Sequence, residues 1–279
     1  MTLSPELNRL IEVSAPLWAG EAEVVRTYWD SPVRTLETDL LWLRRQCSKE
    51  FNGSGLGEFG NLGVFLGPLT ELREAFPKID SGTDDSVPRA HVQDLIESIS
   101  EEFEHFCLFA DVHDGIRPAG TPPLNPQCIE PWDEDTALTA LRHAHIEAHG
   151  DLGKRACRFT EGGYCTLFRE GMRLKGHGGK FAKANELIAA ACGEIYTDEF
   201  GHMLEGIAGL DREGWSAGDF RLMENLVVEQ LRQRIRMRNA EFSFPLSEER
   251  VQAIYAGDIT PEPFDFAEAE ARLARRKAA

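Results

Sequence analysis

The sequence lacks the marks of a membrane or secreted protein. No window approaches the ~20 consecutive apolar residues that a membrane-spanning helix needs. The segment Met1–Val13 carries acidic residues and no basic flank before an apolar stretch, so it does not have the pattern of a secretory signal. The six cysteines show no C-x-x-C spacing, and several fall in helical apolar stripes, as buried thiols do. We expect a protein of the reducing cytoplasm without a membrane partner.

Positive charge is scarce as well. The chain has 30 Lys and Arg against 47 Asp and Glu, which gives a formal net charge of -17 at pH 7. This surplus of negative charge repels a phosphate backbone, so we expect no nucleic-acid partner. The H-E-x-x-H and G-x-S-x-G motifs and glycine-rich phosphate-binding loops are also missing.

Strand-type alternation is almost absent, whereas helical periodicity runs along most of the 279 residues. We therefore predict an all-α protein. The simplest division is a single domain, residues 1–279, with a bundle core at roughly 58–210 and peripheral helices in 1–57 and 211–279. The expected helices lie near Glu6–Val13, Pro32–Phe51, Asn61–Phe76, Pro88–Ala110, Asp135–Ala148, Lys154–Leu174, Phe181–Leu210, Gly218–Asn239 and Ala267–Lys277.

Two E-x-x-H quartets occur in these helices, at Glu102–His105 and at Glu199–His202. A carboxylate and an imidazole three residues apart lie on one helix face and can reach one cation. Two such helices, with two further carboxylates, can enclose two irons. The apolar stripe through Ile188 and Ile195 continues into the second quartet, so we expect its Glu and His to face the core. The alternative for the second quartet is a buried structural Glu bonded to His, and for the first it is a His105 that simply sits at the bundle boundary.

The first quartet follows its apolar stripe less closely. The stripe runs through Ile99 and Phe106 and includes Glu102, which is therefore the inward acid. His105 lies ~60° beyond the stripe, at its flank. A carboxylate on an apolar face needs a cation, a strong donor or a proton.

A third acid comes from the segment Lys154–Leu174. If this segment is one helix, Glu161 lies at the centre of its apolar face and Glu170 points away. The K-G-H-G-G-K sequence of Lys175–Lys180 predicts a tight turn into the next helix. An antiparallel return brings Glu161 within about one turn of the level of Glu199, given a rise of ~1.5 Å per residue. The position on the apolar face and the level along the helix axis relative to Glu199 both favour Glu161 over Glu170 as the ligand.

The fourth acid has two candidates. Glu58 begins a stripe through Leu62 and Leu69, but nearby glycines make this a poor isolated helix. Glu37 lies in a helix of better propensity, although it sits at the stripe edge and needs a connection of roughly 35 residues. We prefer Glu58 and leave Glu37 open.

Together these motifs resemble the ferritin-like di-iron carboxylate proteins, whose four-helix core contributes Glu, E-x-x-H, Glu and E-x-x-H in order. The sequence T-D-E-F-G-H (Thr197–His202) is similar to the D-E-x-x-H signature of the oxygenase and ribonucleotide-reductase branch. The resemblance implies a ferritin-like four-helix bundle core with additional peripheral helices. It also implies two Fe ions, with Mn possible at one or both positions, on Glu58, Glu102, His105, Glu161, Glu199 and His202.

The same resemblance implies a non-haem di-iron oxygenase. Its partners are O2, a small organic substrate and an electron-donor protein such as a ferredoxin or reductase; a homodimer stays open. Phe109 replaces the tyrosine of the radical subunits, and Ile195 replaces the third histidine of the aryl-amine N-oxygenases, which disfavours both subtypes. The alternatives are a ferroxidase or iron-binding ferritin-like protein, and a metal-free helical interaction protein.

A separate histidine cluster contains His143, His145 and His149. The last two have the i,i+4 spacing of many zinc pairs. No cysteine or completing acid is evident nearby, so we expect a solvated helix face instead.

Overall fold

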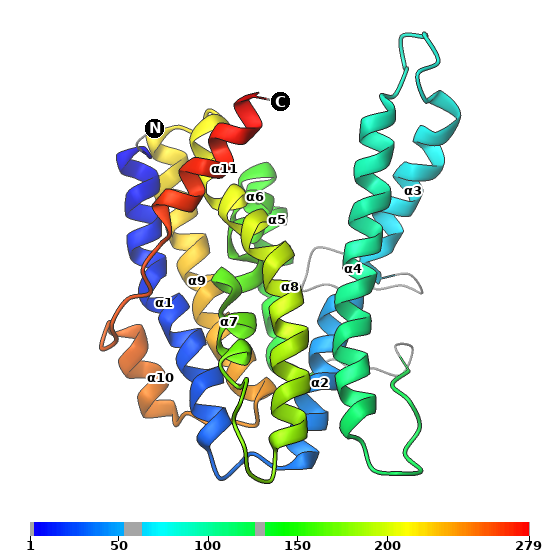
Figure 1. The fold of residues 1–279 in the computed structure, drawn as a ribbon. Coiled ribbons are helices and arrows are strands. Elements are labelled where there is room, and N and C mark those ends of the chain that lie inside the picture. Colours follow the sequence, from blue (N-terminus) through cyan, green and yellow to red (C-terminus); the bar gives the residue numbers. More distant parts are fainter. Residues whose placement is uncertain (1–2, 53–62, 126–131, 279) are drawn as a thin grey trace. The chain divides into compact units, whose positions relative to one another are not determined.

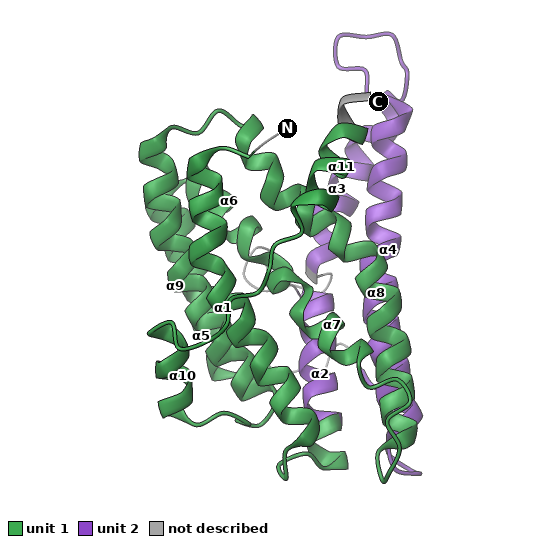
Figure 2. Ribbon diagram, turned by 60° about the vertical axis from the view of Figure 1, so that its left-hand side comes forward, with its two compact units in different colours: residues 1–39, 132–279 green, residues 40–131 purple. Residues whose placement is uncertain are grey.

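The computed structural model describes residues 3–52, 63–125 and 132–278. Its regular structure is helical, and no β-strand occurs within these ranges, which confirms the predicted all-α class (Figure 1). No helix in the same ranges is both long enough and apolar enough to cross a membrane. The chain divides into two compact units, unit 1 with residues 1–39 and 132–279, and unit 2 with residues 40–131 (Figure 2).

Unit 1 is built around the long helices α1 and α9, which pack along each other. Helices α5 and α6 pack against α9, while α7 and α11 pack against α8. The bounds are α1 (Pro5–Asp30), α5 (Asp133–His149), α6 (Asp151–Thr160), α7 (Thr166–Met172), α8 (Ala182–Ala208), α9 (Ala217–Glu241), α10 (Glu248–Tyr255) and α11 (Phe266–Ala278). The helices predicted near α5, α8, α9 and α11 are confirmed, whereas α10 was not predicted.

Helix α1 is much longer than the Glu6–Val13 segment predicted from the sequence. The Ser4 side chain accepts from the Leu7 N–H at 3.1 Å, which caps the start of the helix. Pro16 lies inside the helix and removes one backbone hydrogen bond there. The helix continues because tertiary packing supplies most helical stability in proteins, and Trp18 and other apolar side chains of α1 are fully buried.

The segment predicted as one helix, Lys154–Leu174, is broken in the structure. Between α6 and α7 lies the short helical segment η4 (Glu161–Cys165), in which Gly162, Gly163, Tyr164 and Cys165 all have positive φ. A Cβ atom on Gly163 would lie 2.2 Å from Glu21 Oε2, so glycine is needed there for space as well as for its φ of +53°. The prediction of one continuous helix was therefore wrong. Residues before and after the break cannot be assigned to a common helix face by counting ~100° per residue through it.

A buried ion-pair cluster joins α1 to α9 next to this break. The Glu21 carboxylate accepts from Arg234 at 2.8 Å and from Arg238 at 3.0 Å. Arg238 also pairs with Glu241, and all these side chains are buried. Burial alone would raise the pKa of Glu21, but the two arginines outweigh burial and lower this pKa below its ordinary value.

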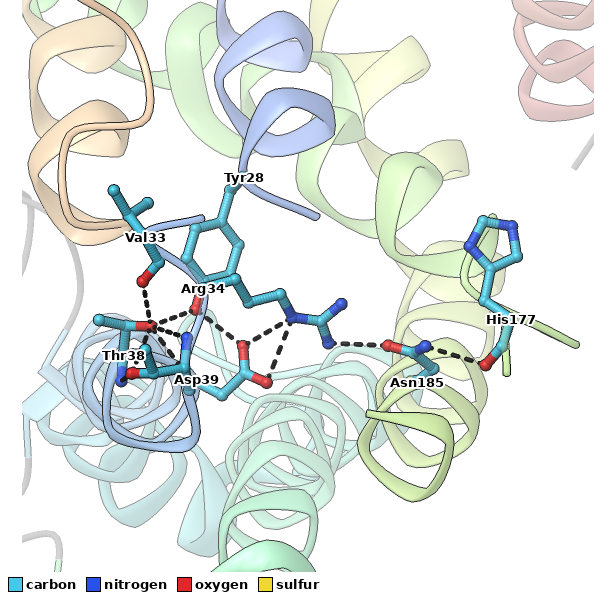
Figure 3. Close-up of polar contacts among 8 residues, drawn as sticks. Tyr28, Val33, Arg34, Thr38, Asp39, His177 and Asn185 are labelled. Atoms are coloured by element: carbon cyan, nitrogen blue, oxygen red, sulfur yellow. Dashed lines mark hydrogen bonds and ion pairs between the residues drawn. The ribbon is translucent and has the colours of Figure 1, made fainter. Parts of the chain in front are cut away.

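A second buried polar cluster connects α1, the start of α2 and α8 (Figure 3). The Tyr28 hydroxyl donates to Asp39 Oδ1 at 2.8 Å, and Arg34 Nε donates to both Asp39 oxygens at 3.2 and 3.3 Å. Arg34 also donates to Asn185 Oδ1 at 2.7 Å, and Asn185 donates to the His177 carbonyl at 2.9 Å. His177 lies in the connection from α7 to α8, where the glycine-rich turn was predicted.

Unit 2 contains the helical hairpin of α3 (Leu66–Ala75) and α4 (Arg89–Ile116), the short segments η1 (Gly63–Phe65) and η2 (Phe76–Lys78), and most of α2 (Leu36–Asn52). Helix α2 packs against α4 through edge-to-face rings, with Trp42 at 6.0 Å from Phe109 and Phe51 at 5.5 Å from Phe106. This packing brings the last turn of α2 to the middle of α4, where the first E-x-x-H quartet lies.

Candidate metal centre

Three side chains of unit 2 converge in a carboxylate–histidine cluster. One ligand atom each from Glu50, Glu102 and His105 lies within 4.8 Å of the others. Glu102 and His105 come from successive positions on one face of α4, and the last turn of α2 brings Glu50 to them. We call these three residues the metal triad. Among the residues that the structure describes, this is the one group of three or more His, Cys, Asp or Glu side chains whose ligand atoms lie this close together.

The burial of the metal triad is uneven. His105 is 2% exposed, whereas Glu50 and Glu102 are half-buried. The sequence predicted that His105 lies at the flank of the apolar stripe of its helix. The structure buries the side chain more deeply than this position suggested. The imidazole is therefore held in place by packing, whereas both carboxylates stay partly accessible to solvent.

Four phenylalanine rings of unit 2 form a connected group on α2, η1 and α4. Phe51, Phe65, Phe103 and Phe106 contact one another with ring centroids 5.5–6.1 Å apart. Phe103 lies next to Glu102 in the sequence and is 51% exposed. Phe51, Phe103 and Phe106 are sequence neighbours of Glu50, Glu102 and His105, so the triad residues and the phenylalanine group lie in the same turns of α2 and α4.

A nearby thiol is not suited to act as a further ligand. Burial, together with the negative charges of Glu50 and Asp114, raises the pKa of the Cys47 thiol well above its ordinary value. Metals bind the thiolate form of cysteine, which is therefore disfavoured here. The donors are two carboxylates and one imidazole, which suit iron(II) or manganese(II) and balance the charge of one divalent cation.

The structure brings together only part of the predicted ligand set. Glu102 and His105 lie in the metal triad as expected. Glu58 lies outside the described residues, and Glu37 lies in the first turn of α2, where it is exposed. Glu50 was not predicted as a ligand, although the sequence contained an indication. Glu50 follows Cys47 by three residues, so it lies on the same helix face and extends the apolar stripe of α2.

The other predicted ligands, Glu161, Glu199 and His202, belong to unit 1. Glu161 is exposed and occupies the first position of the broken segment η4. The acid that is buried is Glu170, which is ion-paired with Arg173 at 3.1 Å. The expectation that Glu161 faces inward and Glu170 outward was wrong, because the left-handed residues between them reset the helical phase.

The second quartet also differs from its predicted phase. His202 is exposed and Glu199 is half-buried, whereas Gly201 and Leu204 are buried. Helix α11 explains this, because the guanidinium of Arg272 lies directly over Gly201 and covers that face of α8. Glu199 contributes, after burial, to raising the pKa of the Cys165 thiol. Metal binding by Glu161, Glu199 and His202 remains a prediction.

The separate histidine cluster divides into exposed and buried members. His143 is exposed, as the predicted solvated face requires. His145 is 7% exposed, so the prediction of a solvated face was wrong for this residue. Its ring nitrogens lie 3.1 Å from Glu229 Oε2 and 3.0 Å from Gln230 Nε2, and these contacts satisfy the imidazole.

Comparison with protein-family models, with curated proteins and with solved structures finds no match to this chain. Fold and site thus define an all-helical protein whose described part carries one carboxylate–histidine cluster.

Proposed function

We propose that this chain is a non-haem iron-dependent oxidoreductase that uses O2 to oxidise a small organic substrate. One observation carries the proposal: the ligand atoms of Glu50, Glu102 and His105 lie within 4.8 Å of one another. Three protein ligands leave coordination positions free for small molecules. A reduced iron ion bound there supplies electrons for the activation of O2.

We further propose that the chain binds two iron ions, with manganese as the alternative at one or both positions. The ferritin-like pattern requires Glu, E-x-x-H, Glu and E-x-x-H in order. Glu50 precedes the first quartet and fits the first place, which Glu58 was predicted to fill. The remaining ligands of the proposal follow in the same order: Glu161, Glu199 and His202. This set is supported by residue types and by their order along the chain.

The residues of unit 2 have distinct roles in this proposal. The metal triad holds an ion, and the phenylalanine rings pack α2 against α4 in the turns that carry the triad. The reaction types that fit are C–H hydroxylation, N-oxygenation and oxidative cleavage. Turnover requires electrons, for which we propose a donor protein such as a ferredoxin or reductase in the reducing cytoplasm.

Iron content and O2 uptake test this proposal together. The full chain, loaded anaerobically with Fe(II) and then desalted, is expected to retain about two irons and to consume O2 when reduced. Glu50→Ala and His202→Ala are each expected to lower the iron content. Glu97→Ala is the control, because Glu97 is an exposed acid on α4.

Each other outcome of the iron measurement has a definite meaning. A chain without iron contradicts the proposal and favours a metal-free helical interaction protein. Repeated oxidation of many Fe(II) ions per chain favours a ferroxidase. One retained iron that is lost in Glu50→Ala but kept in His202→Ala supports the metal triad and contradicts the two-ion ligand set.

A further inference from the structure

Glu50 is held by a hydrogen bond from within its own helix. Gln46 lies one turn earlier in α2 and is 4% exposed. Its side-chain amide Nε2 donates to Glu50 Oε1. One of the two carboxylate oxygens of Glu50 therefore already accepts a hydrogen bond when the side chain reaches the metal triad.

This arrangement limits how Glu50 can bind a cation. A carboxylate binds a metal ion through one oxygen or through both. A hydrogen bond occupies one lone-pair position of the oxygen that accepts it and fixes the orientation of the carboxylate, which favours binding through the other oxygen. Hydrogen bonds to ligating carboxylates orient them and tune the metal. We propose that Gln46 is a positioning residue that restricts Glu50 to a single ligating oxygen and so keeps one coordination position open for water, O2 or substrate.

The inference rests on the proposed metal site and deepens it. The ordinary explanation is that Gln and Glu four residues apart often pair on a helix surface. The chain offers a direct comparison, because Gln93 Nε2 donates to Glu97 Oε1 at 2.6 Å in the same i,i+4 arrangement on α4. That pair is exposed and lies outside the metal triad, whereas Gln46 is buried and its acceptor is a member of the triad.

Manganese(II) alone is the probe for this test, with the full chain of wild type, Gln46→Leu and Gln93→Leu. At saturating Mn(II), the relaxation of water protons per chain reports the exchangeable water ligands. We expect Gln46→Leu to lose relaxivity equivalent to about one water ligand per chain, because the released Glu50 closes on its ion with both oxygens. Gln93→Leu should keep the relaxivity of the wild type.

The contrary results are equally specific. Equal relaxivity in Gln46→Leu and wild type overturns the inference, as does an equal loss in both variants. A folded Gln46→Leu chain that binds no Mn(II) also overturns it, because Gln46 is then needed for binding itself. If Gln46→Leu does not fold, Gln46→Met keeps the length of the side chain and takes the same test. A wild-type chain that binds no Mn(II) or Fe(II) refutes the proposed function instead.

Discussion

His105→Ala is expected to lower the affinity of the chain for Fe(II) or Mn(II) by at least about 100-fold. In the proposed site His105 is the nitrogen ligand of the metal triad, and the structure holds it in a buried position on α4. Loss of a hydrogen bond behind a ligand typically reduces metal affinity 10–100-fold, so removal of the ligand itself should reach or exceed the upper figure. Equilibrium titration with each ion, followed by measurement of bound metal, gives the affinity.

His91→Ala provides the matched control for this experiment. His91 lies on the same helix, is exposed, and pairs with Glu71 at 2.9 Å away from the metal triad. Its replacement should leave the metal affinity unchanged. Equal losses in both variants would indicate a general effect on α4, and no loss in His105→Ala would remove His105 from the site.

The second large effect is expected for Glu21→Gln, which should lower the free energy of unfolding by disrupting the buried ion-pair cluster between α1 and α9. Glu21→Gln keeps the shape of the side chain but leaves the buried charges of Arg234 and Arg238 without their shared carboxylate. Removal of one partner of a buried pair typically costs ~3–5 kcal/mol, because the remaining charge stays desolvated. We expect a loss of this size in the free energy of unfolding at neutral pH, measured by urea denaturation.

The same cluster predicts how the effect of Glu21→Gln changes with pH. The folded-state pKa of Glu21 is lowered, so its contribution is fully present above its ordinary value of 4.5. The contribution is lost as the pH falls below 4.5 and through the lowered pKa. The difference in stability between wild type and Glu21→Gln should therefore be constant near neutral pH and shrink in acid. A difference that grows in acid would contradict the assignment.

Glu23→Gln is the control for burial. Glu23 lies on the same helix and forms two hydrogen bonds with Arg250, at 2.6 and 2.7 Å, but both side chains are partly exposed. Exposed pairs contribute at most ~1 kcal/mol, so this variant should be nearly as stable as the wild type. A loss equal to that of Glu21→Gln would mean that burial is not the cause.

The spacing of apolar residues along the sequence correctly predicted features that lie within a single uninterrupted helix. Glu102 and His105 are three residues apart on α4, so their shared face follows from helical geometry alone. Helices α8 and α9 were located for the same reason, because long apolar stripes mark them. The predicted class, all-α, rests on the same signal.

The features that the sequence did not predict depend on contacts between distant segments. Glu161 and Glu170 exchanged their expected environments because four left-handed residues interrupt the helix. His202 is exposed and Gly201 buried because α11, from the end of the chain, covers one face of α8. Glu50 was overlooked because its relation to the first quartet comes from the packing of α2 on α4. A break in a helix, or a distant helix packed over one of its faces, leaves the spacing of apolar residues in the sequence unchanged, so this spacing cannot reveal either feature.

The central claim is that Glu50, Glu102 and His105 bind a metal ion, and anomalous X-ray scattering at the iron absorption edge tests it most directly. Crystals of the iron-loaded chain should show an anomalous peak about 2.0–2.3 Å from a carboxylate oxygen of each glutamate and from a ring nitrogen of His105. Iron located at other side chains, with no peak at these three, would contradict the account.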